Sequence, residues 1–198
     1  MSASAFLLHR LMPGISTPLL AAPPIRLRAF SAALLVAAAL ACTRSTPTPT
    51  VQVQPLDADA FQELVLASRG RPLLVNLWAT WCEPCKQELL TLEALSRDLG
   101  ESVHLIGVSV DAPERIAQVR ELLALLNVSF PQYIRMEADD EAFINAVDPG
   151  WNGALPSTFV YDDSGIRARR LVGLQTRESL IQALEPLLAG AAIASGER

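Results

Sequence analysis

The sequence is poor in the residues that build metal centres and disulfide frameworks. Its 198 residues include three cysteines and two histidines. Cys42 ends an apolar stretch near the N-terminus, which leaves Cys82 and Cys85 as the only pair in the rest of the chain. The globular part of the chain offers two thiols and one histidine, His104. A tetrahedral zinc site needs four ligands. The pair is therefore either redox-active or one structural bridge, and a bridge over two residues restrains little chain.

Positive charge is also scarce. The chain carries 16 basic residues against 21 acidic ones, a formal net charge of -5. Three of the basic residues (Arg10, Arg26 and Arg28) lie in residues 1–41, which contain no acid, so the remainder has 13 against 21 and a formal charge of -8. Nucleic acids need basic partners for their phosphates, and this balance argues against them. It favours a soluble domain with neutral or basic protein partners.

Long apolar runs are missing too. Residues 29–41 are thirteen residues without a charge, which fits the apolar region of a signal peptide and is short of the about 20 residues that span a bilayer. Residues 39–41 read Ala-Leu-Ala, a signal-peptidase site directly before Cys42. We therefore predict a signal peptide over residues 1–41. Two interpretations stay open at Cys42: cleavage without a lipid, or lipidation as in a bacterial lipoprotein, although Ala39 and Leu40 reverse the usual order.

The rest of the chain divides into a tether, one domain and a tail. Residues 42–55 contain three prolines among Thr, Ser and Gln, a composition typical of an extended tether. With 51% apolar residues, the chain is long enough for one domain with a real core, which we place at residues 56–190. Residues 191–198 are predicted to be a disordered tail.

Within that domain, helical and strand patterns alternate. Helices are predicted over residues 58–68, 83–99, 112–126, 137–147 and 176–188, strands over 73–78 and 103–110, a short edge strand over 131–136, and a hairpin of 156–161 with 166–172. The continuous apolar strands 73–78 and 103–110 indicate a sheet covered on both faces. The pattern predicts an α/β domain with a central mixed sheet flanked by helices.

The two thiols lie where the first apolar strand gives way to a helix. Residues 81–85 read Trp-Cys-Glu-Pro-Cys, and the helical pattern starts there. Proline is tolerated in the first turn of a helix, and it fixes the turn between the sulfurs. Unpaired N–H groups and the positive end of the helix favour the thiolate form of Cys82, expected at the exposed tip. Cys85, one turn further on, can then attack a mixed disulfide formed at Cys82.

Residues 76–88, Asn-Leu-Trp-Ala-Thr-Trp-Cys-Glu-Pro-Cys-Lys-Gln-Glu, resemble the active site of the thioredoxin superfamily. More narrowly, they are similar to the membrane-tethered, TlpA-like thiol-disulfide oxidoreductases, which include the cytochrome c maturation reductases. The resemblance covers residues 56–188. It implies a thioredoxin-like fold with a TlpA-type insertion between the second and third main strands, a nucleophile at Cys82 and a resolving thiol at Cys85.

The same resemblance assigns roles to acidic and amide residues near the thiols. Asn76 occupies the position where ordinary thioredoxins carry a buried aspartate that moves the proton of the resolving thiol. Glu88 matches an acidic residue of the TlpA-like reductases, and on the helix face of Cys85 it would shuttle a proton or hold one thiol protonated. A solvent-exposed glutamate is the alternative. Glu83 and Pro84 would tune the pair, since a carboxylate opposes ionisation of a neighbouring thiol and favours a reductant, against the effect of the helix end.

Further residues are expected to receive the substrate. Pro156 resembles the cis-proline that faces the thiols in this superfamily, although Ala154 stands where the family usually has glycine. Leu155 would then offer its backbone to an incoming peptide for strand-like pairing. Trp81 is expected to flank and shield the sulfurs. Trp151 either rims the active-site groove or packs under a loop.

The leading interpretation is an extracytoplasmic oxidoreductase that reduces disulfides in exported proteins on the periplasmic side of a bacterial cell envelope, with no cofactor beyond the Cys82–Cys85 pair. Apocytochrome c is one candidate substrate by resemblance, and a membrane thiol transporter of the DsbD or CcdA kind is the implied electron donor. A peroxiredoxin-like peroxidase would need Thr-x-x-Cys, but Ala79 stands three residues before Cys82. A copper-delivery protein or a redox-inactive binding module is the other alternative, and no third metal ligand stands out.

Overall fold

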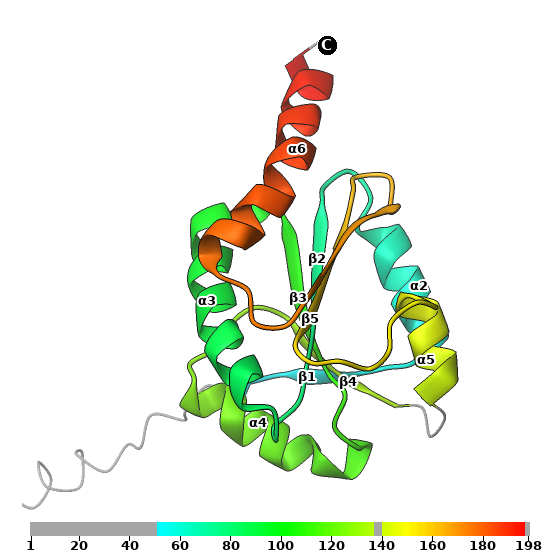
Figure 1. Cartoon of the computed structure of the whole chain (residues 1–198), viewed down its shortest axis with the longest axis vertical. Coiled ribbons are helices and arrows are strands. Elements are labelled where there is room, and N and C mark those ends of the chain that lie inside the picture. Colours follow the sequence, from blue (N-terminus) through cyan, green and yellow to red (C-terminus); the bar gives the residue numbers. More distant parts are fainter. Residues whose placement is uncertain (1–50, 137–139, 197–198) are drawn as a thin grey trace, which may run out of the picture. The chain divides into compact units, whose positions relative to one another are not determined.

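The computed structural model describes residues 51–136 and 140–196 of the protein. The predicted signal peptide, Cys42 and most of the predicted tether lie outside the described residues. In chain order the elements are β1 (Val53–Leu56), α2 (Ala58–Ala67), β2 (Leu73–Trp78), α3 (Glu83–Leu99), η1 (Gly100–Ser102), β3 (His104–Ser109), η2 (Pro113–Arg115), α4 (Ile116–Leu125), β4 (Gln132–Arg135), α5 (Asp140–Val147), β5 (Ser157–Tyr161), β6 (Arg167–Val172) and α6 (Arg177–Gly196) (Figure 1).

The strands form one mixed sheet with the order β1-β4-β3-β2-β5-β6. The four strands β1, β4, β3 and β2 are parallel, whereas β5 runs antiparallel to β2 and β6 antiparallel to β5. Every residue of β2 is buried, as the continuous apolar run predicted. The α/β thioredoxin-like fold with a central mixed sheet is thereby confirmed, and α4, β4 and α5 occupy the chain between β3 and β5.

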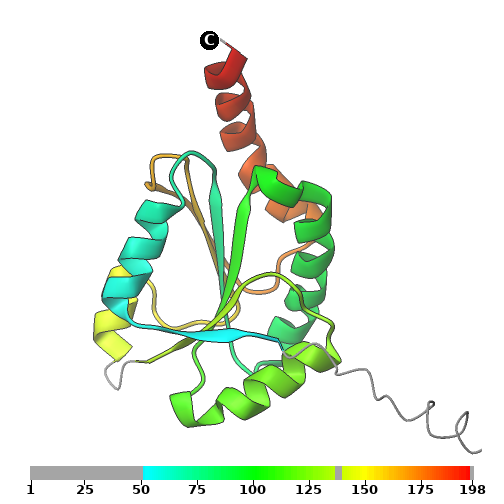
Figure 2. The ribbon, with the colours of Figure 1, turned by 180° about the vertical axis from the view of Figure 1, so that it is seen from behind.

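Two cores lie on opposite faces of the sheet. Helices α3, α4 and α6 contribute to one core, and α2 and α5 to the other, an arrangement that both views of the ribbon show (Figures 1 and 2). Because successive side chains of a strand alternate between faces, Leu74 and Trp78 of β2 pack toward α3 and Val75 toward α2. Asn76 shares the face of Leu74 and Trp78. The only amide of this strand is therefore directed toward the helix that carries the thiols.

The N-terminal edge of the sheet corrects two predictions. Residues 53–55, assigned to the tether, belong to β1, which pairs with β4 from Val53 opposite Gln132 to Leu56 opposite Arg135. As a result β4 lies between β1 and β3 and is not an edge strand. The residues were misassigned because the short segment contains a proline, yet its buried positions Val53 and Leu56 join the core of the domain.

The C-terminal end corrects a third prediction. Helix α6 runs from Arg177 to Gly196, so residues 191–196, predicted to be a disordered tail, continue the helix. Pro186 lies inside α6 without ending it. The segment after this proline is rich in alanine, the residue with the highest helix propensity, which explains the extension. Among the described residues, no helix has the length and apolar character needed to cross a membrane.

Candidate active site

The two thiols lie at the carboxyl end of β2 and the start of α3. Cys82 is the N-cap residue of α3, Pro84 lies in the first turn, and Cys82 and Cys85 form a disulfide. Cys85 is fully buried, while Cys82 is 6% exposed. Cys82 is thus the more accessible thiol, as the helix start predicted, but it is much less exposed than the predicted tip. The neighbouring Trp81 is exposed.

Glu88 is buried in the first turns of α3, which excludes the solvent-exposed alternative. Its Oε1 accepts a hydrogen bond of 2.8 Å from the Thr158 hydroxyl and a longer one of 3.3 Å from Asn76 Nδ2. Burial raises the pKa of Glu88 to about 7, against the opposing effects of the Thr158 hydroxyl and of the Gln175 backbone amide. The side chain can therefore gain or lose a proton in the neutral pH range.

The group that holds Glu88 is a small polar cluster inside an apolar core. Asn76 of β2 lies opposite Thr158 of β5 in the antiparallel register, and Asn76 Nδ2 donates to Thr158 Oγ1 at 3.0 Å. Among the described residues, Asn76 Oδ1 and Glu88 Oε2 have no hydrogen-bond partner of ordinary geometry. Buried polar atoms are nearly always paired. A buried carboxylate oxygen without a hydrogen-bond donor is poorly stabilised as an anion, and it can therefore accept a proton. Sequence reasoning missed Thr158, whose only signal is a hydroxyl in an apolar strand.

The predicted cis-proline is present. The Leu155–Pro156 bond is cis, and Pro156 precedes β5 directly. Trp151 fixes the preceding turn, because its Nε1 donates to Ala154 O at 3.0 Å and to Ser157 Oγ at 3.1 Å. The backbone of half-buried Leu155 is held at its N-terminal side by these contacts.

A small pocket lies beside this turn. It has a volume of about 200 Å³ and is lined by Trp81, Trp151, Leu155 and other, mainly apolar, residues (Val110, Arg135, Phe143, Ile144 and Gly153). Trp151 is 7% exposed and packs edge-on against Phe159. Trp151 therefore packs beneath its own loop, as one interpretation predicted, and it also lines this pocket.

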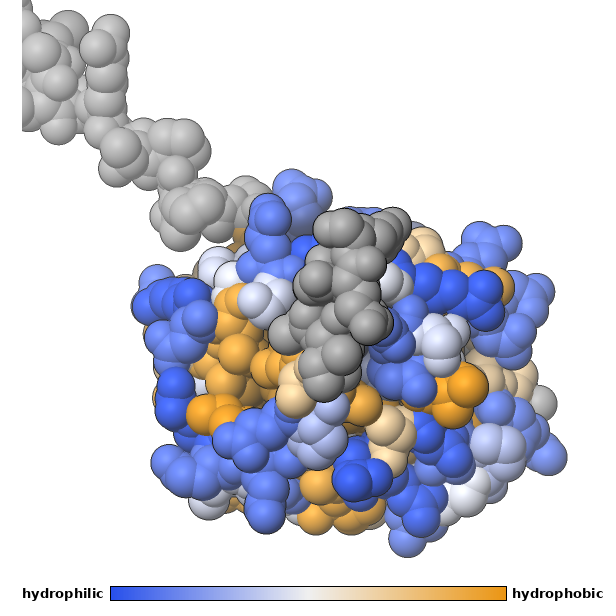
Figure 3. Space-filling view, turned by 90° about the horizontal axis from the view of Figure 1, so that it is seen from above, coloured by the Kyte–Doolittle hydropathy of each residue, from blue (hydrophilic) through white to orange (hydrophobic). Residues whose placement is uncertain are grey.

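A larger cavity, of about 430 Å³, lies at the other end of β3, beside His104 and Tyr133. Cys82 and Cys85 do not line it. Seen from above, apolar and hydrophilic residues alternate over the visible surface (Figure 3). The smaller pocket includes Trp81, the residue directly before Cys82.

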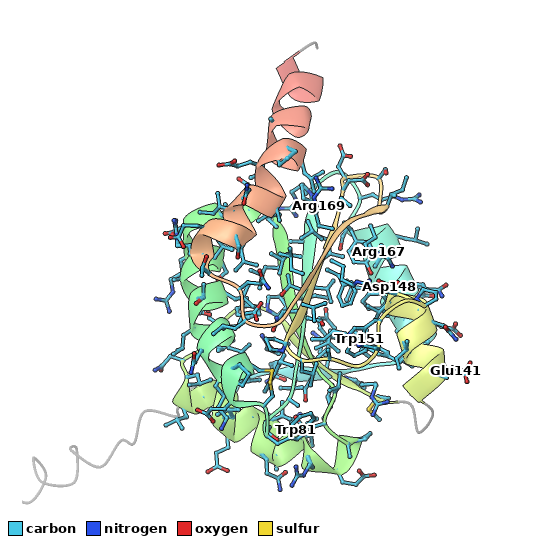
Figure 4. The ribbon with its side chains drawn as sticks, in the orientation of Figure 1. Trp81, Glu141, Asp148, Trp151, Arg167 and Arg169 are labelled. Carbon is cyan, nitrogen blue, oxygen red and sulfur yellow. A yellow bond between two sulfur atoms is a disulfide. The ribbon has the colours of Figure 1, made fainter. Side chains whose placement is uncertain are left out.

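A buried ion-pair cluster anchors the loop that carries Trp151. Asp148 is 4% exposed, and its carboxylate contacts Arg167 Nη1 at 3.1 Å and Arg170 Nη1 at 2.9 Å, both from β6. It also accepts the Gly150 N–H at 2.9 Å. Figure 4 shows Asp148, Arg167 and Trp151 on the same side of the molecule as α5. The sequence indicated only a turn-rich loop here, because the arginine partners lie about twenty residues away.

Glu83, predicted to tune the thiols, points largely into solvent. Its side chain is 73% exposed and pairs with Lys86 Nζ at 2.8 Å. Solvent screens an exposed pair strongly, so the buried Glu88 is the less screened of the two carboxylates. In residues 51–136 and 140–196, no cluster of three or more His, Cys, Asp or Glu side chains is placed to hold a metal ion.

A strand, a helix that begins at a Cys-x-x-Cys pair, and a cis-proline directly before the strand β5 define a thioredoxin-like redox domain. Residues 45–168 match the AhpC/TSA family, and the chain belongs to this family. It is 35% identical over 147 residues to the thiol:disulfide interchange protein HelX of Rhodobacter capsulatus, covering 73% of this chain and 76% of HelX. It is 29% identical to the thiol-disulfide oxidoreductase ResA of Geobacillus thermodenitrificans, covering 66% of this chain and 71% of ResA.

Solved structures agree on the fold. A thioredoxin family thiol:disulfide interchange protein from Chlorobium tepidum superposes with a TM-score of 0.52 at 24% identity, covering 62% of this chain and 83% of that one. A DsbF homologue from Corynebacterium diphtheriae gives a TM-score of 0.52 at 22% identity, covering 61% and 74%. The chain has the dithiol that exchange with a disulfide requires, and it is a disulfide oxidoreductase.

Proposed function

We propose that the protein is an extracytoplasmic reductase of protein disulfides, with Cys82 as nucleophile, Cys85 as resolving thiol and Glu88 as proton carrier. One observation supports this assignment most strongly: a buried glutamate with a pKa of about 7 lies three residues after a Cys pair at a helix start. Three residues along a helix bring two side chains to the same face. A carboxylate at that place can take the proton that the fully buried Cys85 must lose.

The reaction begins from the dithiol. The Cys82 thiolate attacks one sulfur of the substrate disulfide, a mixed disulfide forms, and the other substrate sulfur leaves as a thiolate that takes a proton from water. The Cys85 thiol then gives its proton to the Glu88 carboxylate and attacks Cys82 Sγ. The Cys82–Cys85 disulfide closes, and the second substrate sulfur leaves as a thiolate that takes a proton from water. Glu88 returns its proton to water, so two electrons have passed from the dithiol to the substrate and the proton count balances.

The substrate would bind along the turn before β5. The Leu155 backbone offers strand-like hydrogen bonds to an extended peptide, and the pocket between Trp81 and Trp151 accepts a neighbouring apolar side chain. Apocytochrome c stays one candidate substrate. The Rhodobacter and Geobacillus relatives are named for thiol-disulfide exchange, which favours this function over a peroxidase or a copper carrier, as does Ala79 three residues before Cys82.

We place the domain on the periplasmic side of a bacterial envelope, supplied with electrons by a membrane thiol transporter of the DsbD or CcdA kind. The support is the apolar segment of residues 29–41, which ends at Cys42. If a lipid is attached there, metabolic labelling with a fatty acid should tag the wild type and not the Cys42→Ala variant. An unlabelled wild type would leave only an ordinary signal peptide.

Reduction of insulin with dithiothreitol as electron source tests the function. The wild-type domain should accelerate insulin precipitation, and Cys82→Ser should return the rate to that of dithiothreitol alone, because no nucleophile remains. Cys85→Ser should instead accumulate a mixed disulfide on Cys82. The Glu83→Gln variant is a suitable control, since an exposed residue next to the nucleophile is changed while both thiols remain. A wild-type protein that fails to accelerate the reaction contradicts the proposal.

A further inference from the structure

A second buried carboxylate, Asp111, holds the loop that leads into Cys82. Its side chain is fully buried after β3. The Thr80 N–H donates to Oδ2 at 2.7 Å, the Thr80 hydroxyl donates to Oδ1 at 2.7 Å, and the Ser109 hydroxyl donates to Oδ2 at 2.8 Å. Arg115 contributes a distant ion pair, with its Nη1 3.8 Å from Oδ1. Hydrogen bonds to an ionised acceptor are about twice as strong as neutral ones, so Thr80 is held by both its backbone and its side chain.

Thr80 lies two residues before Cys82, within the connection from β2 to α3. The neighbouring contacts are backbone bonds: Val110 N–H donates to Trp78 O at 2.8 Å, and Cys82 N–H to Ala79 O at 3.1 Å. Asp111 is the one side chain that ties this connection, through Thr80, to the turn after β3 in the contacts of the described residues. In the disulfide state, the bond to Cys85 also fixes Cys82. In the dithiol state that bond is gone, and the place of Cys82 depends on the loop.

We propose that Asp111 is a positioning residue that acts through Thr80 to hold the Cys82 thiol beside Cys85 and so favours closure of the disulfide. Holding two reacting groups together raises the effective concentration of one against the other. A dithiol that closes readily is the stronger reductant, since oxidation of the pair is favoured. This inference deepens the proposed reductase function, and its biological meaning rests on that function. The equilibrium of the Cys82–Cys85 pair itself is measured without any protein substrate.

The test is the equilibrium of the Cys82–Cys85 pair with mixtures of dithiothreitol and its cyclic disulfide at pH 7, read by acid quenching and alkylation. Thr80→Val removes one donor and leaves the Asp111 charge in place. It should make the disulfide about threefold less favoured, a part of the effect of one hydrogen bond. In Asp111→Asn the side-chain amide cannot accept hydrogen bonds from all three donors. This variant should make the disulfide about tenfold less favoured, an effect of the size expected for one charge-assisted hydrogen bond.

Two further measurements separate positioning from a simple charge effect. Thr80→Ser keeps the hydroxyl and should restore the wild-type equilibrium. If Asp111 acted only through its charge, Asp111→Asn would move the midpoint of Cys82 alkylation to lower pH. Thr80→Val would then keep the wild-type equilibrium between dithiol and disulfide. The other ionisable groups on the packed elements, Glu83 and Glu88 of α3 and Arg115, are the same in all variants.

Asp162→Asn is the matched control, because Asp162 also accepts several hydrogen bonds, from Ser164 and Ile166, but in the turn between β5 and β6. It should leave the equilibrium unchanged. The proposal is overturned if Thr80→Val and Asp111→Asn lower only the stability of the oxidised protein, or if Asp111→Asn alone shifts the equilibrium. If the wild type reduces no insulin while these shifts occur, the reductase function fails and the positioning role stands.

Discussion

Helix α3 buries two glutamates, five residues apart, in different surroundings. Glu93 is 4% exposed, and both of its oxygens are paired: Ser129 N–H donates to Oε2 at 2.7 Å, while the Ser129 hydroxyl at 2.8 Å and Arg97 Nη2 at 2.7 Å contact Oε1. Glu88 is fully buried, and in the described part of the chain it forms no ion pair and its Oε2 has no hydrogen-bond partner of ordinary geometry. The two carboxyl groups share a helix but differ in how well their charge is compensated.

The difference indicates that Glu93 stabilises the structure, whereas Glu88 is suited to proton transfer. The hydrogen bonds and the cation at Glu93 stabilise its carboxylate, which ties α3 to the segment before β4. The cluster of Asn76 and Thr158 compensates Glu88 only in part, and burial raises its pKa to about 7. A group with such a pKa gains and loses a proton near neutral pH, which is the property that proton transfer requires.

The pH dependence of stability should reveal the difference most strongly. Below pH 4.5 Glu88 is protonated in both the folded and the unfolded chain. From about pH 4.5 to pH 7 the unfolded chain releases this proton and the folded one retains it, so the free energy of unfolding should fall with rising pH by up to about 3 kcal/mol. Glu88→Gln should lack this component. Urea unfolding of the oxidised proteins between pH 5 and 8 measures it, and equal slopes would contradict the raised pKa.

The second prediction concerns Glu93. Glu93→Gln loses the Arg97 ion pair and puts an amide against the Ser129 donors, so the free energy of unfolding at pH 7 should fall by about 2 kcal/mol. Insulin reduction, measured at a temperature where the variant is folded, should stay at the wild-type rate. A stable variant with impaired disulfide exchange would erase the distinction between the two glutamates.

Local patterns predicted much of this molecule. The apolar runs predicted β2 and β3. The position of Glu88 three residues after Cys85 predicted its place on the helix face of the thiols. Its burial could not be predicted, because it depends on how β5 and α6 pack over α3.

The missed residues share one cause. Thr158 meets Asn76 across 82 positions of sequence, and Asp111 meets Thr80 across 31. No local periodicity links such pairs, because the register of the sheet brings them together. Strand β1 was missed for a related reason, since its assignment depends on pairing with β4 rather than on its own proline-containing sequence.

The central claim, that Glu88 controls the protonation of the thiols, is tested most directly by the pH profile of alkylation. The reduced wild type, Glu88→Gln and the matched control Glu93→Gln would be treated with iodoacetamide from pH 5 to 10, and the first modification followed by mass. A carboxylate near a thiol opposes its ionisation, so the midpoint for Glu88→Gln should lie about one pH unit below that of the wild type, equivalent to about 1.4 kcal/mol. Glu93→Gln should keep the wild-type midpoint. Superimposable curves for the wild type and Glu88→Gln would contradict the account.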